Sequence, residues 1–328
     1  MPPDDYAARC EAERDHYRDQ TEVHDLPGIC FYWLNRYILP EMARLGVSSA
    51  DEFFASNLLR AFAASRSKSR RFISLGAGNC DTEIRLARTL LESGARDFVI
   101  DCLDLNEDML GRGVRAAADQ GVGAHVRPVQ GDFNAWQPCF AYDAILANQA
   151  LHHVVQLEAL FDACRGALTP AGLFVVSDMI GRNGHRRWPE ALGLVEQFWS
   201  ELPESYRYNR QLRRQESGYP DWDCSVEGFE GIRSQDILPL LLHHFRFRFF
   251  YAFANVIDPY IDRGFGPNFD VNSERDRAFI DRVHACDQRE MRAGRVKPTH
   301  MLAVLGREET GDLVCLDGRT PEFCVRWP

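Results

Sequence analysis

The chain has 328 residues, too many for one minimal domain and about right for one large domain with additions. Its hydrophobic content of 45% is that of a globular protein that buries a real core. The formal net charge of −10 argues against a general grip on nucleic-acid phosphates, which needs clustered Lys and Arg.

The ten cysteines include no Cys-x-x-Cys pair, which favours small buried thiols in a reducing compartment. No apolar core of a signal peptide follows Met1, and no run of 18 apolar residues is present. We therefore expect a cytoplasmic protein without a membrane span.

Three helices are expected in an N-terminal helical cap, residues 1–70. The first, over 4–20, is polar, and the second, over 28–45, is dense in aromatic residues. Pro40 falls inside the second helix and predicts a kink near Leu39. Ser49 or Ser48 is expected to cap the third helix, whose apolar positions recur at helical spacing.

A strand over 72–75 then runs into Gly76-Ala77-Gly78, and a helix follows over 81–91. Small residues are needed there because the chain reverses sharply and its backbone must approach a ligand closely. Further strands over 98–103, 126–129 and 142–147 end at three polar groups: Asp104; Gly131-Asp132-Phe133; and Asn148-Gln149. In such sheets an acidic residue after the second strand accepts ribose hydroxyls.

The fifth strand, over 173–177, is continuously apolar, and the core predicted to this point spans 71–181. A helical insertion over 182–240, with helices near 188–202 and 206–215, is expected to lie above the carboxyl ends of the strands. A helix over 232–243 leads to the end of the sheet, 241–306, with strands over 245–253 and 299–305. A second insertion over 257–297 carries a helix over 273–293. The tail, 307–328, is expected to form a hairpin around Asp317-Gly318.

These motifs, in this order and spacing, resemble those of class I S-adenosylmethionine-dependent methyltransferases, chiefly over residues 70–180. The resemblance implies an α/β fold: a Rossmann-like, seven-stranded, mostly parallel sheet with helices on both faces. It implies that the last strand lies antiparallel between the fifth and the sixth. It also implies S-adenosyl-L-methionine as the cofactor, with S-adenosyl-L-homocysteine as the product.

The same resemblance implies which residues hold the cofactor. Gly76 and Gly78 would pass the methionine part, Asp104 would hold the ribose, and Asp132 would accept from the adenine amino group beside Phe133. In this family, helices before the first strand commonly cover the cofactor cleft. The resemblance therefore implies that aromatic and basic residues of these helices also contact the cofactor. The predicted cofactor-binding residues are Gly76, Ala77, Gly78, Asn79, Asp104, Leu105, Asp132, Phe133, Asn148, Tyr32 and Arg36.

His152 and His153 follow the fourth strand and are the predicted catalytic residues, since a histidine near pH 7 can take a proton from a hydroxyl. A structural or substrate-shaping role stays open for both, and His185 and His300 are weaker candidates. The predicted substrate-binding residues are Trp33, Gln149 and Arg182. No metal site is predicted, because the fourth strand ends in Ala147-Asn148-Gln149 without the carboxylates that a catechol-type site needs.

Two alternative chemistries fit less well. A nicotinamide-binding turn expects a third glycine at position 81, where Asp81 stands. Enzymes that methylate DNA amino groups or glutamine carry Pro-Pro-Tyr after the Asn or Asp at position 148, where this chain has Gln-Ala-Leu. We therefore favour methyl transfer to a small-molecule acceptor, at oxygen over nitrogen. A non-catalytic S-adenosylmethionine-binding module and a nicotinamide-dependent oxidoreductase are the alternatives.

The acceptor's charge is left open by the sequence. Asp223, Glu227 and Glu230 could steer a cation, and Arg182, Arg186 and Arg187 an anion, but each set also fits an ordinary charged surface. The expected partners are a small molecule and neither nucleic acid nor membrane, and the oligomeric state is not predicted.

Overall fold

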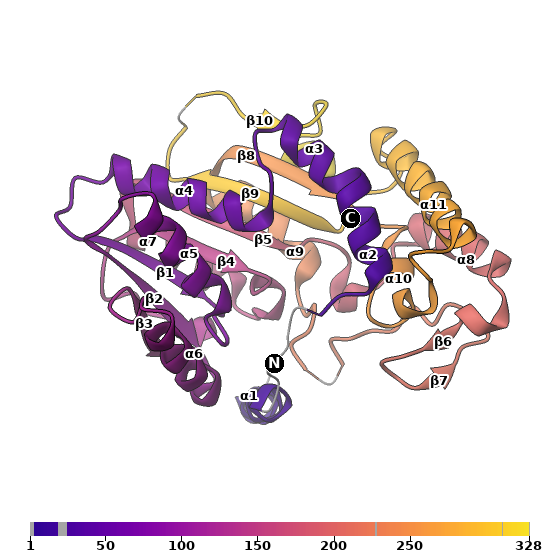
Figure 1. The fold of residues 1–328 in the computed structure, drawn as a ribbon, viewed down its shortest axis with the longest axis horizontal. Coiled ribbons are helices and arrows are strands. Elements are labelled where there is room, and N and C mark those ends of the chain that lie inside the picture. Colours follow the sequence, from indigo (N-terminus) through magenta and orange to yellow (C-terminus); the bar gives the residue numbers. More distant parts are fainter. Residues whose placement is uncertain (1–2, 19–24, 227, 310, 328) are drawn as a thin grey trace.

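One mixed sheet organises the computed structural model, which describes residues 3–18, 25–226, 228–309 and 311–327 (Figure 1). Its strands lie in the order β10-β8-β9-β5-β4-β1-β2-β3. Neighbouring strands from β3 to β5 are parallel, and β9 is antiparallel to both β5 and β8, as predicted. The strands are β1 (Arg70–Leu75), β2 (Phe98–Asp104), β3 (Val126–Gln130), β4 (Tyr142–Asn148), β5 (Leu168–Met179), β8 (Arg246–Phe253), β9 (His300–Gly306) and β10 (Val314–Cys315).

The eighth strand of this sheet, β10, corrects the predicted number of seven. It pairs in parallel with β8 at the edge of the sheet, so the tail does not fold back on itself as a hairpin. Asp317 and Gly318 do make a turn with positive φ values of 50° and 71°. The chain after this turn enters α12 (Pro321–Cys324), because Thr320 caps a helix there.

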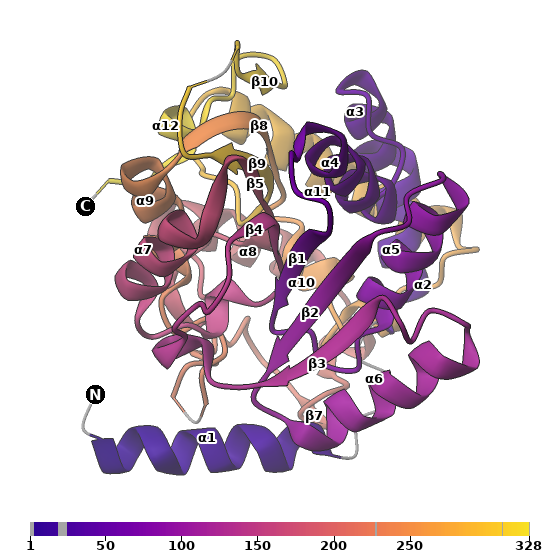
Figure 2. The ribbon, with the colours of Figure 1, turned by 90° about the vertical axis from the view of Figure 1, so that its left-hand side faces the viewer.

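Both faces of the sheet are buried, as its continuous apolar strands require. Alternate residues of each strand point to opposite faces: Phe72 and Ile100 pack on one side, and Ile73 and Leu103 on the other. Figure 2 shows the sheet edge-on, between these two layers of helices. Flanking the parallel strands are α4 (Ala50–Ala64), α5 (Asp81–Glu92) and α6 (Glu107–Asp119) on the first face and α7 (Leu157–Ala167) and α9 (Ser234–His244) on the second.

The N-terminal helices agree with the predictions in kind. Helix α1 (Pro3–Arg18) covers most of the first predicted helix, and residues 19 and 20 lie outside the described residues. The second divides into α2 (Gly28–Trp33), a π-helical turn and α3 (Leu39–Arg44), because Pro40 lacks the N–H that a continuous helix requires. Ser49 caps α4 by accepting from the backbone N–H of Glu52 at 3.1 Å.

The insertions correct one predicted helix. Helices α8 (Pro189–Glu201), α10 (Asp258–Ile261) and α11 (Glu274–Arg292) are present, but residues 206–215 contain the short hairpin β6 (Tyr208–Asn209) and β7 (Arg214–Gln215). The side chain of Asn209 accepts from the backbone N–H groups of Gln211 and Leu212, each at 3.0 Å. This local turn competes with helix formation.

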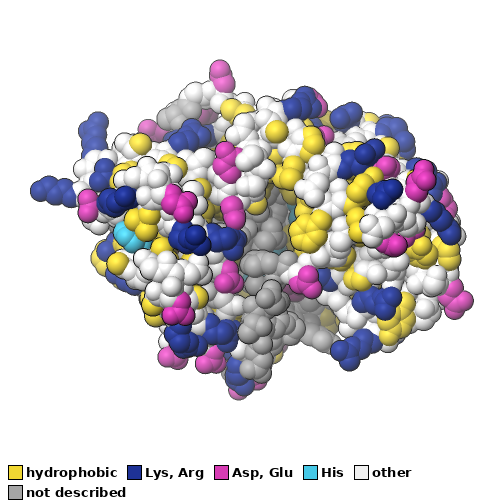
Figure 3. All heavy atoms as spheres, viewed as in Figure 1, with side chains coloured by type: hydrophobic (Ala, Val, Ile, Leu, Met, Phe, Trp, Pro, Cys, Tyr) yellow, Lys and Arg dark blue, Asp and Glu magenta, His cyan; other side chains and the backbone are white. Residues whose placement is uncertain are grey.

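The surface carries no strongly basic region on the face drawn in Figure 3, where Lys and Arg side chains are intermixed with Asp and Glu. Within the described ranges, every helix is too short or too polar to cross a bilayer. The division of the chain at residues 70, 181, 240 and 306 stays a prediction.

Candidate functional site

The glycine turn after β1 forms the floor of the site. Gly76 and Gly78 have φ values of 69° and 53°, in the left-handed region that glycine adopts without strain. The backbone N–H groups of Gly76 and Ala77 both donate to the carbonyl of Leu103, at 2.8 and 3.1 Å. A Cβ atom on Gly76 would lie 2.8 Å from that of Ala150, so this position has room for glycine alone.

Asp104, at the end of β2, lies beside this turn. Its Oδ2 accepts from the N–H of Gly78 and its Oδ1 from the N–H of Asn106, both at 2.8 Å. Burial raises the pKa of Asp104, and these two N–H groups oppose the rise. Each carboxylate oxygen keeps a second lone pair, so Asp104 can still accept from two ligand hydroxyls.

Asp132 and Phe133 follow β3 and complete this half of the site. The ring of Phe133 lies 3.6 Å from the position of a Cβ on Gly76. Asp132 accepts from the N–H of Asn134 at 2.8 Å and from the hydroxyl of Tyr6 at 2.5 Å. Tyr6 was not predicted as a site residue, because the polar pattern of α1 says nothing about what the helix covers.

The structure also locates the other residues that were predicted near the glycine turn. Ala77 is half-buried, Leu105 is half-buried directly after Asp104, and Asn79 is buried with its Oδ1 2.9 Å from Nε of Arg112. The amide of Asn148 lies 3.5 Å from Oγ1 of Thr82 on α5. Gln149 is exposed, with a φ of 55° held by a 2.7 Å bond from its N–H to the carbonyl of Ser177.

A cluster of histidines and carboxylates forms the other half of the site. His152 is buried in the turn after β4, and its Nδ1 lies 2.7 Å from Oδ1 of Asp178 at the end of β5. Asp178 also accepts from the backbone N–H groups of Ala150 and Leu151, at 2.9 and 2.7 Å. Burial disfavours the ionised carboxyl, but His152 and these N–H groups outweigh it and lower the pKa of Asp178. The carboxylate only accepts hydrogen bonds, so Nδ1 of His152 carries a proton.

Glu230 lies among three imidazoles. Its Oε1 is 2.6 Å from Nε2 of His185 and 3.4 Å from Nε2 of His152, and its Oε2 is 3.4 Å from Nε2 of His153. Burial opposes a charge on His152, but Asp178 and Glu230 outweigh it and raise the pKa of His152 to about 10. Burial lowers the pKa of His185, and Glu230 offsets only part of that effect. Each of these side chains was predicted as a candidate by itself, and nothing in their spacing along the sequence indicated that they meet.

Helix α1 lies along this edge of the sheet and joins the two halves (Figure 2). Glu13 of α1 has its Oε1 3.0 Å from Nδ1 of His153. Arg9 donates to the carbonyls of Ser225 and Gly228, at 2.9 and 2.6 Å, and so ties α1 to the insertion. The side chain of Asn106 reaches the other end of α1 at the carbonyl of Arg14, at 3.2 Å.

Three residues predicted from the second helix have other partners in the structure. The hydroxyl of Tyr32 and the guanidinium of Arg36 contact Asp281 of α11, at 2.9 and 3.5 Å. Trp33 is buried, and its indole N–H donates to Nδ1 of His284 at 3.1 Å. The structure does not bring these residues to the glycine turn, and their contact with cofactor or acceptor stays a prediction.

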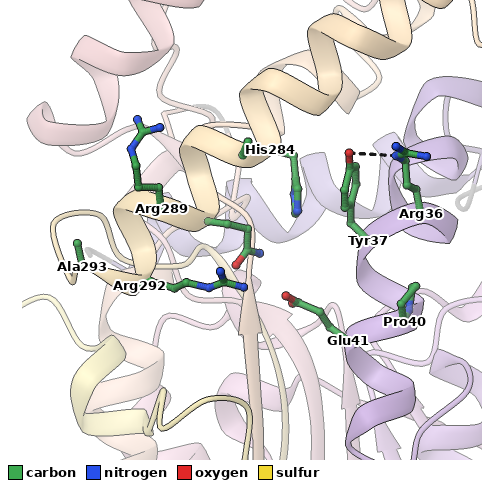
Figure 4. Close-up of a pocket in the computed structure, with 10 residues that line it drawn as sticks. Arg36, Tyr37, Pro40, Glu41, His284, Arg289, Arg292 and Ala293 are labelled. Atoms are coloured by element: carbon green, nitrogen blue, oxygen red, sulfur yellow. Dashed lines mark hydrogen bonds between the residues drawn. The ribbon is translucent and has the colours of Figure 1, made fainter.

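Arg36 instead lines a separate cavity of about 740 Å³ between the π-helical turn (Leu34–Ile38), α3 and α11 (Figure 4). Tyr37 stacks on His284 there, with ring centroids 3.8 Å apart. Glu41 and Arg292 point toward one another across the cavity. None of the predicted glycine and aspartate positions lines it, so it is distinct from the site at the edge of the sheet.

Some of the charged residues predicted in the insertion bond to other protein groups, and one lies at the histidine cluster. Arg187 is buried and its Nη1 donates to Asp258 at 2.7 Å, and the guanidinium of Arg182 donates to the carbonyl of Arg187 at 2.9 Å. Asp223 accepts from the hydroxyl of Ser225 at 2.6 Å. Glu227 lies outside the described residues. Arg186 lies 3.4 Å from Asp221, so among the described members of this set Glu230 faces the histidines.

These residues fit the group that the sequence motifs imply. The glycine turn presents backbone without side chains next to Asp104, whose carboxylate accepts from the N–H of Gly78, and Asp132 follows β3, the strand next to β2. A ligand with sugar hydroxyls and an aromatic amine matches such acceptors.

Comparison with known proteins agrees with this assignment. Residues 73–174 match the model of a family described as "Methyltransferase domain". No curated protein sequence matches the chain significantly.

Solved structures with a related arrangement include a geranyl diphosphate C-methyltransferase of Streptomyces coelicolor (12% identity, 92% of this chain, 98% of that chain, TM-score 0.48). A second is a protein of Galdieria sulphuraria assigned as a sarcosine dimethylglycine methyltransferase (16% identity, 80% of this chain, 86% of that chain, TM-score 0.47). A third is the [4+2]-cyclase SpnF (13% identity, 80% of this chain, 84% of that chain, TM-score 0.43). Because the identities are this low and the TM-scores are below 0.5, these structures do not indicate the methyl acceptor of this chain.

Proposed function

We propose that this chain is a class I S-adenosylmethionine-dependent methyltransferase that methylates an oxygen atom of a small-molecule acceptor, and the match of residues 73–174 to a methyltransferase domain supports the transferase activity. The methyl donor is S-adenosyl-L-methionine, and the product is S-adenosyl-L-homocysteine. The observation that carries the choice of oxygen is His153, a partly exposed imidazole between two carboxylates at the carboxyl edge of the sheet.

The donor brings an activated methyl group with its leaving group attached, so the protein supplies alignment and a proton acceptor. Asp104 holds the ribose, Asp132 and Phe133 hold the adenine, and Gly76 lets the methionine part lie close to the backbone. His153 takes the proton of the acceptor hydroxyl. Glu13, 3.0 Å from Nδ1, orients the ring, and Nε2, 3.4 Å from Glu230, is the nitrogen that receives the proton.

Helix α1 and the segment around Glu230 cover the histidines at the carboxyl edge of the sheet. This cover supports a small acceptor. We assign acceptor binding to Gln149, which is exposed directly after β4, and Arg182 can join it only by exchanging its bond to the carbonyl of Arg187 for one to the acceptor; His152 is a positioning residue. A location in the cytoplasm agrees with the ten unpaired cysteines.

Calorimetry with S-adenosylmethionine tests the cofactor assignment. The intact chain is expected to bind one equivalent, and Asp104→Ala to weaken binding at least tenfold, since each lost charge-assisted hydrogen bond contributes about 1.5–3 kcal/mol. If the alanine variant unfolds, Asp104→Asn replaces it, because the amide keeps one oxygen that can accept from the turn. Its affinity for S-adenosylmethionine is then compared with that of the wild type. Asp119→Asn, at the exposed end of α6, is the matched control. Failure of the intact chain to bind the cofactor would overturn the proposal.

Turnover separates an enzyme from a binding module. Extracts of small molecules incubated with methyl-labelled cofactor are expected to yield a labelled O-methyl product with the wild-type chain. His153→Gln should lower that yield by about 10²–10⁴-fold while leaving cofactor affinity unchanged. Binding without any labelled product favours the non-catalytic module, and a tight titration with reduced nicotinamide cofactor favours the oxidoreductase.

A further inference from the structure

The side chains around Glu230 have the composition and spacing of a transition-metal site. His152 comes from the turn after β4, His185 from the turn after β5, and Glu230 from the segment before α9. One ligand atom from each of the three lies within 4.8 Å of the other two. Three separate segments therefore direct two imidazole nitrogens and a carboxylate oxygen at one point.

We propose that His152, His185 and Glu230 bind a divalent transition-metal ion of the zinc class, with one coordination position left for an oxygen of the methyl acceptor. The choice of acceptor rests on the proposed function, whereas binding of the ion does not. Two histidines and one carboxylate with an open position are a ligand set of catalytic zinc and of non-haem iron.

Two of the three ligand distances are within about 1 Å of those in a zinc site, and the third, between His152 and His185, is at most 4.8 Å. Zinc–nitrogen and zinc–oxygen bonds of roughly 2.0–2.2 Å place the ligand atoms of a tetrahedral site about 3.3 Å apart. Nε2 of His152 already lies 3.4 Å from Oε1 of Glu230. The contact between His185 and Glu230, at 2.6 Å, must open by less than about 1 Å, and Glu230 is half-exposed and able to move.

A second layer of groups already orients the ligands. Asp178 accepts the Nδ1–H of His152, which turns Nε2 toward Glu230, and a metal ion bound there would displace the proton that Nε2 carries in the metal-free chain. A carboxylate behind a histidine ligand is the usual arrangement at protein metal sites. Asp178 is itself held by the N–H groups of Leu151 and Met179, at 2.7 and 2.8 Å, so it cannot turn away.

The backbone around His185 is held in a conformation that brings it close to Glu230. His185 has a φ of 57°, uncommon for a residue with a side chain, and follows Gly184 with a φ of 66°. The N–H of Gly184 donates to the carbonyl of Gly231 at 2.8 Å, and a Cβ on Gly231 would lie 3.0 Å from the His185 ring. Such strain tends to occur at functional sites, where surrounding contacts hold it.

The charges of the cluster also favour a cation. Three carboxylates, of Glu13, Asp178 and Glu230, face the imidazoles of His152, His153 and His185. In the metal-free chain the proton on His152 offsets one of these three negative charges, and a divalent ion that takes the place of this proton would offset more of their repulsion.

The open position gives the ion a task in methyl transfer. A bound divalent ion lowers the pKa of a coordinated hydroxyl, so the acceptor can lose its proton at neutral pH. The O–H bond breaks and the proton goes to His153. The oxygen's electron pair then forms the new C–O bond, while the methyl–sulfur bond breaks and its electrons stay on sulfur. The acceptor class is accordingly a small molecule with a hydroxyl or enol oxygen that can coordinate a metal.

Metal titration of the full chain tests the inference without an acceptor. After removal of metals with a chelator, the wild-type chain is expected to bind one equivalent of Zn²⁺ by calorimetry, and Co²⁺ should give visible absorption bands of low coordination number. Glu230→Gln, which preserves volume, and His185→Ala should each lower the affinity at least tenfold. His243→Ala, an exposed histidine on α9, should leave it unchanged.

Absence of stoichiometric binding, or equal affinity in wild type and both ligand variants, would overturn the inference. The same metal-free protein is titrated with S-adenosylmethionine. Cofactor binding without metal binding removes only this inference, whereas failure to bind the cofactor removes the proposed function.

Discussion

Asp178 accepts the Nδ1–H of His152 at 2.7 Å, and both side chains are buried where β5 and the turn after β4 end side by side. This pair fixes the tautomer and direction of the His152 ring. Because His152 in turn faces Glu230, the orientation of one imidazole sets the geometry of the whole cluster.

Replacing Asp178 with Asn tests this relationship. The variant keeps an acceptor oxygen and the side-chain volume but removes the charge that holds His152, so kcat for methyl transfer should fall by about 10–100-fold. The Kd for S-adenosylmethionine, measured by calorimetry, should stay within about twofold, since Asp178 does not contact the glycine turn. A change in cofactor affinity as large as the change in kcat would show that Asp178 supports the fold and not the histidine. Thermal unfolding of the variant shows whether it remains folded.

The glycine turn offers a matched pair of substitutions. Gly76→Ala combines a positive φ with a Cβ 2.8 Å from that of Ala150, whereas Gly46 has a φ of 78° and nothing within 4 Å of its added Cβ. Gly46→Ala should therefore lose about 1 kcal/mol from the backbone alone, and Gly76→Ala about 1–3 kcal/mol more. Urea unfolding measures both values, and equal losses would contradict the predicted close approach.

Tyr6 joins α1 to Asp132, in the turn after β3. Tyr6→Phe removes the hydroxyl that donates to Asp132, a charge-assisted bond that contributes about 1.5 kcal/mol. Amide hydrogen exchange in residues 3–18 should consequently become roughly tenfold faster. Tyr208→Phe on β6 is the control. Unchanged protection of α1 in Tyr6→Phe would mean that the contacts of Arg9 and Glu13 are sufficient to hold the helix.

The buried carboxyl of Asp287 predicts a pH dependence of stability. Burial and the nearby charge of Asp258 raise the pKa of Asp287 to about 7, although it accepts from the N–H groups of Asn255 and Val256. Between about pH 4 and pH 7 the folded chain holds a proton that the unfolded chain, with a carboxyl pKa of about 3.9, has released. This group's contribution to stability therefore falls as pH rises through that window, by at most about 1.4 kcal/mol per unit.

Asp287→Asn should flatten this part of the pH profile. Urea unfolding at pH 5 and pH 7.5 compares the two proteins, and the wild type should lose more of its free energy of unfolding between these values than the variant. A variant with the same pH profile as the wild type would show that Asp287 is ionised in the folded chain at both pH values.

The parallel strands and the glycine turn were predictable because each depends on residues close together in the chain. Apolar runs mark strands that are buried on both faces, and Gly76 and Gly78 mark a turn that other residues do not adopt. The number of strands was predicted less well. Val314 and Cys315 are too few to make a recognisable strand pattern, and only pairing with Phe249 and Phe250 of β8 gives them one.

The sequence by itself therefore determined where the core strands lie along the chain and where the glycine turn after β1 falls. Tertiary structure alone decided that Glu13, His185 and Glu230 meet His152 and His153, and that Tyr6 reaches Asp132 across 126 positions. The physical reason is that these side chains lie on a polar helix and on irregular segments, where no repeat of apolar residues records which neighbour they face. Their meeting point exists only because parallel strands end at one edge and the insertions fold back over it.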